Sequence, residues 1–402
     1  MIGVEKEPYA DTMLCPNSKK AILRSCGAGI AAADDLMKKN ERVFCAIRPP
    51  GHHAETTKAM GFCFINNIYS NELKYELVVD KLEVPWAFVF LPDNSILITE
   101  RKGELIHFKN GVRNKIKNLP EIISKNQGGL LDIELHPNYK ENNWIYISYS
   151  SSNDKNPGTN TTILRFKLDK DSAENQEIIY KATPNSKRTL HYGSRIIFDK
   201  ENYIFFSIGD RGNRDLNPQD ITRDGGKIYR LHDDGRIPVD NPFVNEKNSK
   251  KAIFSYGHRN PQGMFYDKNE DKIWIHEHGP RGGDEINIIK SGDNYGWPLA
   301  SYGINYIGTK FTDKTSIKGM IDPIHYWVPS IAPSGMVYVD NPNYPTLNKS
   351  ILIGSLKFAY LHQCVIENGK VIKENRLFEQ IGRVRSVELD NDKNVYVGVE
   401  NL

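Results

Sequence analysis

Short apolar strands alternate with polar turns over most of the chain. The repeating unit is an apolar strand, a turn built on Asp, Asn or Pro, and a second apolar strand. It occurs six times, over residues 88–99, 133–148, 196–207, 264–275, 336–354 and 387–398. Such units indicate β-hairpins, and their repetition is typical of a propeller. We therefore predict an all-β six-bladed β-propeller over residues 75–402. A β-sandwich with long loops is the alternative, but it does not explain six similar hairpins.

The first 70 residues have a different pattern. Residues 17–39 read as a helix, because Ile22, Cys26 and Ile30 recur at helical spacing after a capping Asn17 or Ser18. A short apolar strand follows and ends in the loop RPPGHH. We expect residues 1–70 to form a small, incomplete α/β segment ahead of the propeller.

Composition narrows the class of protein. The 402 residues are 39% hydrophobic and 26% charged, with a net charge of +3, which is globular and too balanced for a nucleic-acid or membrane-surface protein. No apolar run is long enough for a transmembrane helix. The first residues lack the pattern of a secretory signal, so the chain as written is expected in the cytoplasm. The five cysteines form no CxxC pair, which favours free buried thiols.

The stretch RPPGHHAETTKAMGFCFINN (48–67) contains the tandem His52-His53. With the preceding helix, it resembles part of the histone deacetylase and acetylpolyamine amidohydrolase family. That resemblance implies that His52 and His53 handle the proton of a zinc-bound water. A catalytic zinc needs about three protein ligands, and the family takes them from an Asp-x-His and a later Asp. None of the 11 histidines has Asp two positions before it. We expect a non-catalytic fragment, left by a gene fusion or a misassembled reading frame.

A second set of motifs begins at about Tyr75 and runs to the end. In order they are PWAFVFLPD, NQGGLLDIELHPNY, LHYGSRIIFD, IGDRG, YGHRNPQGM, EHGPRGGDEINIIKSGDNYGWP, GSLK and RVRSV. Together they resemble the soluble quinoprotein glucose/sorbosone (aldose sugar) dehydrogenases. The resemblance implies a six-bladed propeller that uses pyrroloquinoline quinone (PQQ) and calcium to oxidise the C1 hydroxyl of aldoses to lactones. Members of that family work in the periplasm.

Oxidising a hydroxyl requires a general base, and histidine titrates near the working pH. His191 in LHYGSR is the candidate base. The resemblance implies that Asp210 in IGDRG orients it and fixes its tautomer.

PQQ carries three carboxylates, so its pocket should hold several cations, Arg above all. Arg383 and Arg385 lie two apart, on one face of a strand. The resemblance adds Lys357, Gln127 and the Arg259-Asn260 pair, with Arg259 stabilising negative charge on the quinone oxygen.

Calcium prefers oxygen ligands, including backbone carbonyls. The resemblance assigns the carbonyls of Gly279 and Pro280 to the calcium of the cofactor. Asp284, Glu285 and Tyr295 match a second, structural calcium site, although Asp-Glu is also an ordinary solvated turn.

Two departures from the family stand out. Some glucose-oxidising members carry a Trp over PQQ, whereas here Trp327 comes one place earlier and Val328 takes the matching position. The chain also stops at VYVGVENL, where relatives continue with a further strand. We expect a less stable last blade, to which residues 75–82 supply the N-terminal contribution.

Three functions remain open. The first is the PQQ- and calcium-dependent dehydrogenase, with an aldose as substrate and a quinone, cytochrome or dye as electron acceptor. The second is a catalytically silent propeller that serves as a binding module. The third is a zinc-dependent deacetylase, against which the missing ligands argue.

Overall fold

The computed structural model describes residues 73–153 and 156–401. The predicted helix over 17–39 and the His52-His53 pair lie outside the described residues. The chain divides into two units between Glu76 and Leu77, and every element below belongs to the second unit.

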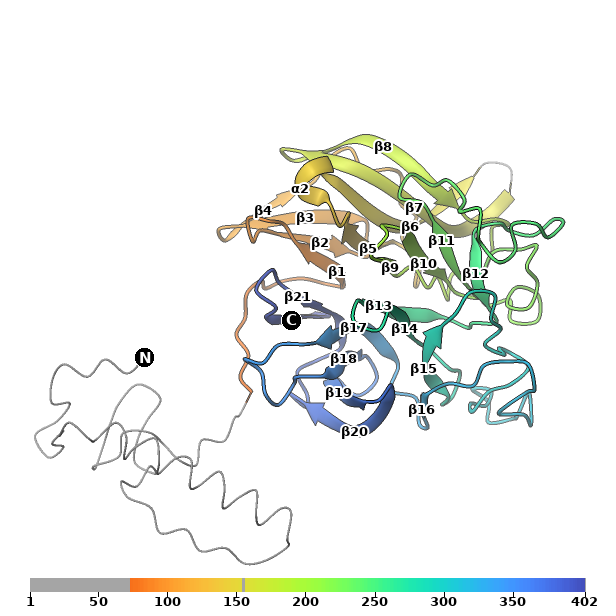
Figure 1. Cartoon of the computed structure of the whole chain (residues 1–402). Helices are drawn as coiled ribbons and strands as arrows, with labels where there is room; N and C mark the ends of the chain where they lie inside the picture. The colour runs from red at the N-terminus through yellow and green to blue at the C-terminus, as the bar shows by residue number, and fades with distance from the viewer. Residues whose placement is uncertain (1–72, 154–155, 402) are drawn as a thin grey trace, which may run out of the picture. The chain divides into compact units, whose positions relative to one another are not determined.

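This second unit is almost entirely β-structure, arranged as a β-propeller. Five of its sheets have four antiparallel strands, a sixth has two, and in each sheet the strands pair in chain order (Figure 1). The first sheet contains β1 (Pro85–Phe90), β2 (Ile96–Glu100), β3 (Glu104–Lys109) and β4 (Val112–Lys115). The second contains β5 (Leu130–Leu135), β6 (Trp144–Asn153), β7 (Asn156–Asp169) and β8 (Ser172–Lys181), with the short helix α2 (Tyr139–Asn142) between β5 and β6.

The remaining sheets follow the same plan. The third contains β9 (Ile196–Phe198), β10 (Ile204–Ile208), β11 (Lys227–Leu231) and β12 (Ile253–Tyr256). The fourth contains β13 (Pro261–Asp267), β14 (Lys272–Glu277), β15 (Asp284–Ile289) and β16 (His325–Trp327). The fifth contains β17 (Pro333–Val339), β18 (Ser350–Ser355), β19 (Tyr360–Glu367) and β20 (Lys370–Leu377). The two-stranded sheet pairs β21 (Val384–Leu389) with β22 (Val395–Val399).

All six predicted hairpins are confirmed, as the pairs β1–β2, β5–β6, β9–β10, β13–β14, β17–β18 and β21–β22. Their turns depend on side-chain oxygens that accept backbone amides. Asp199 Oδ1 accepts the amides of Glu201 and Tyr203, both at 2.9 Å. Asp390 Oδ1 does the same for Asp392 at 2.9 Å and Asn394 at 2.7 Å. These carboxylates satisfy amides that the ladder leaves unpaired, which is why Asp and Asn recur in the turns.

The first strand of each sheet is its inner strand. The inner strands β1, β5, β9, β13, β17 and β21 contact one another in sequence, and β21 returns to β1, so they form a closed ring. Buried hydroxyls link neighbouring sheets across this ring at five of the boundaries. The bonds run from Thr99 to Leu131 O (2.6 Å), Ser148 to Ser194 O (2.7 Å), Ser207 to Pro261 O (3.0 Å), Ser334 to Val384 O (2.6 Å) and Ser386 to Pro85 O (3.2 Å).

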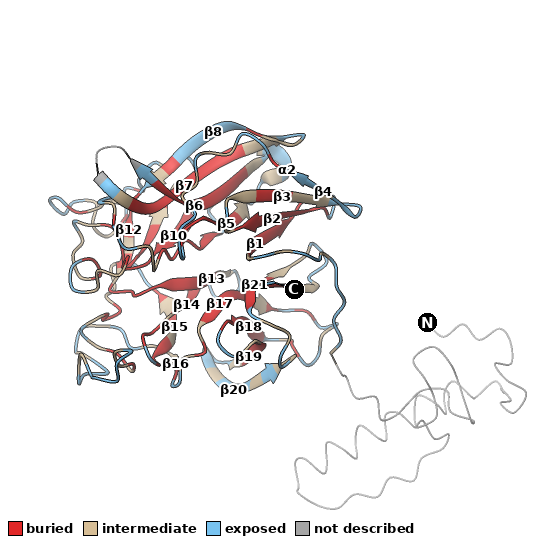
Figure 2. Cartoon of the chain, turned by 180° about the vertical axis from the view of Figure 1, so that it is seen from behind, coloured by how far each residue is buried: buried red, intermediate tan, exposed pale blue. Residues whose placement is uncertain are grey.

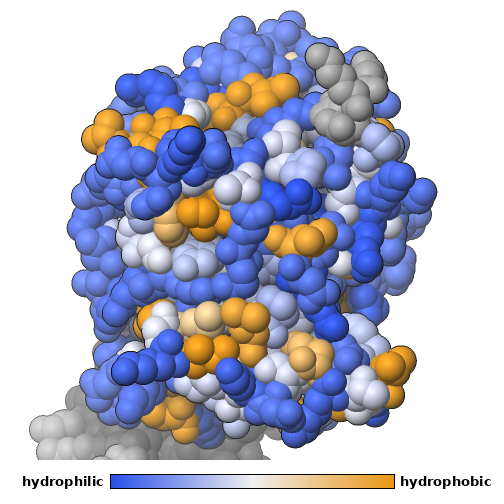
Figure 3. All heavy atoms as spheres, turned by 90° about the vertical axis from the view of Figure 1, so that its right-hand side faces the viewer, coloured by the Kyte–Doolittle hydropathy of each residue, from blue (hydrophilic) through white to orange (hydrophobic). Residues whose placement is uncertain are grey.

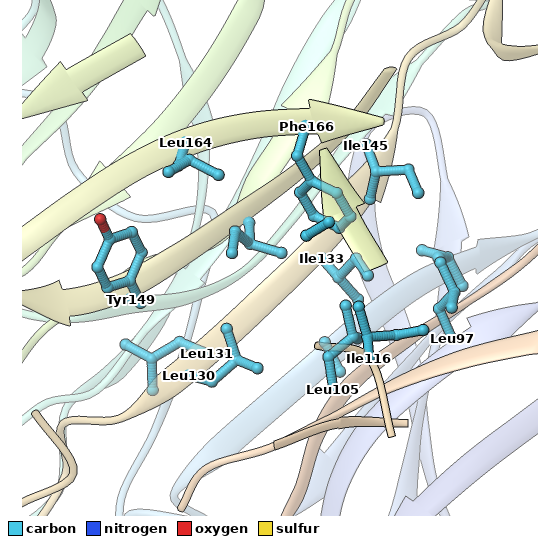
Figure 4. Packing of buried hydrophobic residues seen from close by; sticks show 14 of the residues in the cluster. Leu97, Leu105, Ile116, Leu130, Leu131, Ile133, Ile145, Tyr149, Leu164 and Phe166 are labelled. Atoms are coloured by element: carbon cyan, nitrogen blue, oxygen red, sulfur yellow. The ribbon is translucent and has the colours of Figure 1, made fainter. Parts of the chain in front are cut away.

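Apolar side chains fill the space between neighbouring sheets. In the cluster between the first and second sheets, Leu97 and Leu105 meet Ile133, Ile145 and Phe166 (Figure 4). Inner strands are buried, whereas the outermost strands β8 and β20 are largely exposed (Figure 2). On the face seen in Figure 3 the surface is mostly hydrophilic, with apolar residues in separate patches. The hydrophobic free energy of this unit therefore comes from contacts between sheets.

The expectation for residues 75–82 is wrong in its detail. This segment forms no strand in the described chain. Instead Val79 and Leu82 pack against a cluster that includes Phe88 and Phe90 of the first sheet. No helix among the described residues is long and apolar enough to cross a membrane.

Candidate active site

A cavity of about 1140 Å³ is lined by loops that precede the inner strands and by loops that follow the second strands of several sheets. Nine of the predicted site residues line it, although they come from five different sheets or the loops between them. They are Gln127, His191, Arg259, Asn260, Gly279, Pro280, Lys357, Arg383 and Arg385. The other four, Asp210, Asp284, Glu285 and Tyr295, are not among its lining residues.

His191 lies in the loop between β8 and β9, with a left-handed backbone (φ +54°). Its Nδ1 atom is 2.7 Å from Oδ1 of Asp210, and its amide donates to Oε1 of Gln127 at 2.8 Å. Since a carboxylate can only accept, Nδ1 carries the proton and donates it to Asp210. The lone pair is then on Nε2, where a base needs it.

Asp210 is itself held on both oxygens and is 1% exposed. Its Oδ1 atom accepts the amide of Gly212 at 2.7 Å, and its Oδ2 atom accepts Nε1 of Trp297 at 3.0 Å. Its own amide donates to the carbonyl of Arg259 at 2.7 Å. These bonds fix the carboxylate, and through it the plane of the His191 ring.

The titration of the pair follows from burial and charge. Burial, and then the nearby Arg259 guanidinium, lower the pKa of His191 below its ordinary 6.5. Burial alone would raise the pKa of Asp210, but the hydrogen bond from His191 and the neighbouring cations lower it. At neutral pH the site therefore holds a neutral imidazole beside an ionised carboxylate.

Six cationic side chains line the cavity: Arg101, Arg259, Arg281, Lys357, Arg383 and Arg385. None of its described lining residues is Asp or Glu. Such a cavity favours a ligand with several negative charges. The three carboxylates of PQQ meet that requirement.

Glu400 pairs with two of these cations, Arg383 and Arg385. Its carboxylate accepts Nε of Arg383 at 2.6 Å and Nε of Arg385 at 2.8 Å. Arg383 also donates from Nη1 to the carbonyl of Leu356 at 2.9 Å. One carboxylate thus fixes two guanidinium groups, and their remaining N–H donors can serve a ligand.

Arg259 is fixed through its backbone. Its amide donates to the carboxylate of Glu277, whose other oxygen is 2.9 Å from Nδ1 of His258. Its Nη1 atom donates to the carbonyl of His278 at 2.9 Å. Arg259 is therefore held at the wall of the cavity that His191 also lines, and its charge acts on that histidine.

The Gly279-Pro280 turn matches what calcium would need. Gly279 admits no larger residue, because an added Cβ would lie 2.2 Å from the carbonyl oxygen of Gly282. No hydrogen bond from the described residues uses the carbonyl oxygens of Gly279 or Pro280. Two unused carbonyls at the wall of the cavity fit a hard cation.

Asp284 was predicted as a metal ligand, but its carboxylate is occupied by hydrogen bonds within the protein. It is fully buried, and its Oδ1 atom accepts the amide of Gly279 at 2.8 Å. Its Oδ2 atom accepts the Ser330 hydroxyl and the amides of Ile331 and Ala332, at 2.7, 2.8 and 3.0 Å. Its carboxylate thus ties the Gly279 turn to the loop before β17.

Glu285 lies on β15 and Tyr295 in the loop that follows this strand, and neither residue lines the cavity. Burial, and then the charge of Glu277, raise the pKa of Glu285 well above its ordinary value. The hydroxyl of Tyr295 donates to the carbonyl of Ile288 at 2.8 Å and accepts the amide of Lys290 at 3.0 Å. The predicted second calcium site stays a prediction.

Trp327 does not line the cavity. It is buried on β16, where its Nε1 atom donates to Glu374 at 2.6 Å. Val328, one residue on, does line the cavity and is 61% exposed. An aliphatic side chain therefore occupies this place at the cavity wall.

Sequence reasoning missed several lining residues. They include Trp86, Arg101, Gln262, His278, Arg281 and Tyr306. Burial lowers the pKa of His278 to about 3, so this second histidine at the wall is neutral. Trp86 and His278 stand inside quoted motifs, so the signal was present. Tyr306 lies on a long loop after β15 and carries no motif.

Comparisons with known proteins show which families the chain resembles. The family model described as Glucose / Sorbosone dehydrogenase matches residues 82–402, and the one described as Histone deacetylase domain matches residues 3–71. The chain is 38% identical over 329 residues to an aldose sugar dehydrogenase of Escherichia coli, covering 80% of this chain and 88% of that protein.

Solved structures give the same picture. The crystal structure of the soluble aldose sugar dehydrogenase from Escherichia coli in the apo-form superposes with a TM-score of 0.78 at 37% identity, over 81% of this chain and 95% of that chain. The PQQ-bound form of an aldose sugar dehydrogenase from Streptomyces coelicolor gives 0.68 at 26% identity, over 81% and 91%.

Proposed function

The chain belongs to the glucose and sorbosone dehydrogenase family, and from that premise we propose that it is a PQQ- and calcium-dependent oxidoreductase that oxidises the C1 hydroxyl of aldose sugars to lactones. The observation that carries the proposal is that His191, bonded to the buried Asp210, lies at the wall of a cavity whose described lining residues include six cations and no carboxylate. His191 can serve as the base for the sugar hydroxyl, and the cations can bind the carboxylates of PQQ.

His191 acts as the general base in this proposal. Its Nε2 atom accepts the proton of the sugar hydroxyl, while Asp210 holds the ring and stabilises the imidazolium that results. When bound, PQQ supplies the two-electron acceptor for the hydride that leaves C1. Arg259 would stabilise the negative charge that develops on the bound cofactor, since it is a cationic lining residue of the cavity.

The remaining cavity residues bind and orient the cofactor. Lys357, Arg383, Arg385, Gln127 and Asn260 would contact its carboxylates and carbonyls, and the carbonyls of Gly279 and Pro280 would hold its calcium ion. Asn260 is supported from behind, because its Oδ1 atom accepts the amide of Gly193 at 3.0 Å. The second calcium ion that the resemblance implies at Asp284, Glu285 and Tyr295 is not part of this proposal, because hydrogen bonds within the protein already occupy both oxygens of Asp284.

The proposal includes the domain division and the sixth blade. Residues 75–402 form the dehydrogenase unit, and residues 1–70 are a deacetylase-like fragment without catalysis. We regard β21 and β22 as the inner half of a sixth blade, because β21 completes the ring of inner strands. The electron acceptor is a quinone, cytochrome or dye.

The test is reconstitution of the purified full chain with PQQ and calcium, followed by aldoses and a dye acceptor. Dye reduction is expected. His191→Ala should keep the spectral shift of bound PQQ and lose turnover, whereas His107→Ala, at a histidine outside the cavity, should keep both. If wild type gives neither dye reduction nor a PQQ spectral shift, the proposal is wrong. A PQQ shift without turnover would instead indicate a silent binding module.

A further inference from the structure

A group of metal-ligating side chains lies outside the cavity, on the fifth sheet. His362 and Cys364 are two apart on β19, so they share one face of the strand. Glu374 on β20 is the direct register partner of Cys364. One ligand atom from each of these three side chains lies within 4.8 Å of the other two. Nitrogen, sulfur and oxygen donors thus converge on one point.

The fourth sheet contributes a further donor to this point. His325 on β16 places Nε2 3.3 Å from Oε1 of Glu374, and Nε2 of His362 is 2.7 Å from Oε2 of the same carboxylate. The two imidazoles therefore flank one carboxylate from different sheets. None of His325, His362, Cys364 and Glu374 is a lining residue of the cavity.

Several of these donors are not fully used. Cys364 is a free, completely buried thiol, and Nδ1 of His362 has no hydrogen-bond partner among the described residues. The carboxylate of Glu374 is oriented by three neighbours, since Oε2 contacts Nε2 of His362 and Nε1 of Trp327 and Oε1 lies 3.3 Å from Nε2 of His325. The group therefore combines a carboxylate, two imidazoles and a free thiol.

We propose that His362, Cys364 and Glu374, with His325 as a fourth ligand, bind a divalent transition metal of the Zn²⁺ type. Thiolate and imidazole ligands select Zn²⁺ over calcium and magnesium, which require oxygen. In a tetrahedral zinc site neighbouring ligand atoms are roughly 3.4–3.6 Å apart, as follows from Zn–N and Zn–S lengths of about 2.1 and 2.3 Å. The three ligand atoms lie within 4.8 Å of one another, and Nε2 of His362 is 2.7 Å from Oε2 of Glu374, so small side-chain rotations have to even out these separations when the ion binds.

The exposure of the ligands shows how an ion could reach the site. Glu374 is 35% exposed and His325 20%, so an ion can enter from solvent, whereas His362 is 6% exposed at the inner side. On binding, the thiol proton of Cys364 is released to solvent and an S–metal bond forms. Because His325 belongs to one sheet and the other ligands to the next, the ion would tie two sheets together.

The experiment uses the full chain in calcium-containing buffer, after removal of transition metals, titrated with Zn²⁺ alone. Four further cysteines and the His52-His53 pair lie in residues 1–72 and give the same background in every variant. Wild type should therefore bind one equivalent more than Cys364→Ser or Glu374→Gln. Glu367→Gln, which removes an exposed carboxylate at the end of the same strand, should match wild type.

Two further readouts identify the ligands. With Co²⁺ in place of Zn²⁺, the near-ultraviolet thiolate-to-metal absorption should be larger in wild type than in Cys364→Ser. Saturating Zn²⁺ should raise the Tm of wild type more than that of Glu374→Gln. Equal stoichiometry in wild type and both variants would overturn the proposal. A zinc-soaked wild-type crystal without an anomalous peak between His362 and Cys364 would overturn it as well.

Discussion

Hydrogen bonds fix both the backbone and the ring of His191. Its left-handed φ of +54° is stabilised by the bond from its amide to Gln127, and its Nδ1–H by Asp210. The candidate base could be chosen from sequence because histidine titrates near the working pH and His191 stands in the LHYGSR motif. The supporting residues Trp297 and Glu277 could not, since they come from segments 87 and 18 residues distant from the groups they bind.

The first prediction concerns Asp210. Asp210→Asn should lower kcat roughly 10–100-fold, because the amide no longer fixes the tautomer of His191. Steady-state dye reduction at saturating PQQ measures the effect. Asp199→Asn, which changes a carboxylate in a hairpin turn, is the matched control and should retain kcat. An unchanged kcat in Asp210→Asn would show that the carboxylate does not orient the base.

The second prediction concerns pH. A base must be unprotonated, and the pKa of His191 lies below 6.5. The acid limb of kcat/KM should therefore fall below pH 6.5, with activity lost as pH drops through the folded pKa. Asp210 raises the pKa of His191, so Asp210→Asn should move this limb to lower pH still. A limb above 6.5 would contradict the assignment of His191.

The loops before the inner strands bring the site together at the scale of elements. Each hairpin could be predicted because alternation and an Asp or Asn turn are local signals, as Asp199 and Asp390 illustrate. Outer strands such as β4 and β20 carry no such pattern, because they are largely exposed and their register depends on the neighbouring strand. Likewise the Glu400 pairs could not be predicted, since the two arginines precede it by 17 and 15 residues across a hairpin.

The third prediction tests the pairing of Glu400 with the two arginines. Glu400→Gln should destabilise the fold by about 3 kcal/mol, because it leaves the buried Arg385 unpaired. Glu104→Gln removes an exposed partner of Lys115 and should cost less than about 1 kcal/mol. Urea unfolding of the two variants beside wild type measures the difference. Equal losses would mean that Glu400 forms only a solvent-screened pair.

The sheets of the whole molecule are joined by side-chain hydroxyls as well as by apolar contacts. Ser386 is fully buried and donates to the carbonyl of Pro85, which joins the last sheet to the first. The propeller topology could be predicted from the repeat. The hydroxyl links could not, because Ser and Thr in a strand read as ordinary polar positions.

The fourth prediction follows from these links. Ser386→Ala should lower the free energy of unfolding by about 1–3 kcal/mol, because it leaves a buried carbonyl without its donor. Ser152→Ala removes an exposed hydroxyl bonded to Gly158 and should change stability by less than about 0.5 kcal/mol. Thermal unfolding followed by circular dichroism compares them. A Ser386→Ala melt that coincides with wild type would refute the role of the link.

The Ser386–Pro85 bond also has a consequence for synthesis on the ribosome. Its two residues are 301 positions apart. The strand β1 therefore emerges early, and its partner β21 leaves the exit tunnel only near the end of translation. During that interval the face of the first sheet that later packs on the last sheet has no neighbour, and exposed apolar surface invites association with other nascent chains. The time needed to translate the intervening sheets thus becomes the interval in which the growing chain depends most on chaperones.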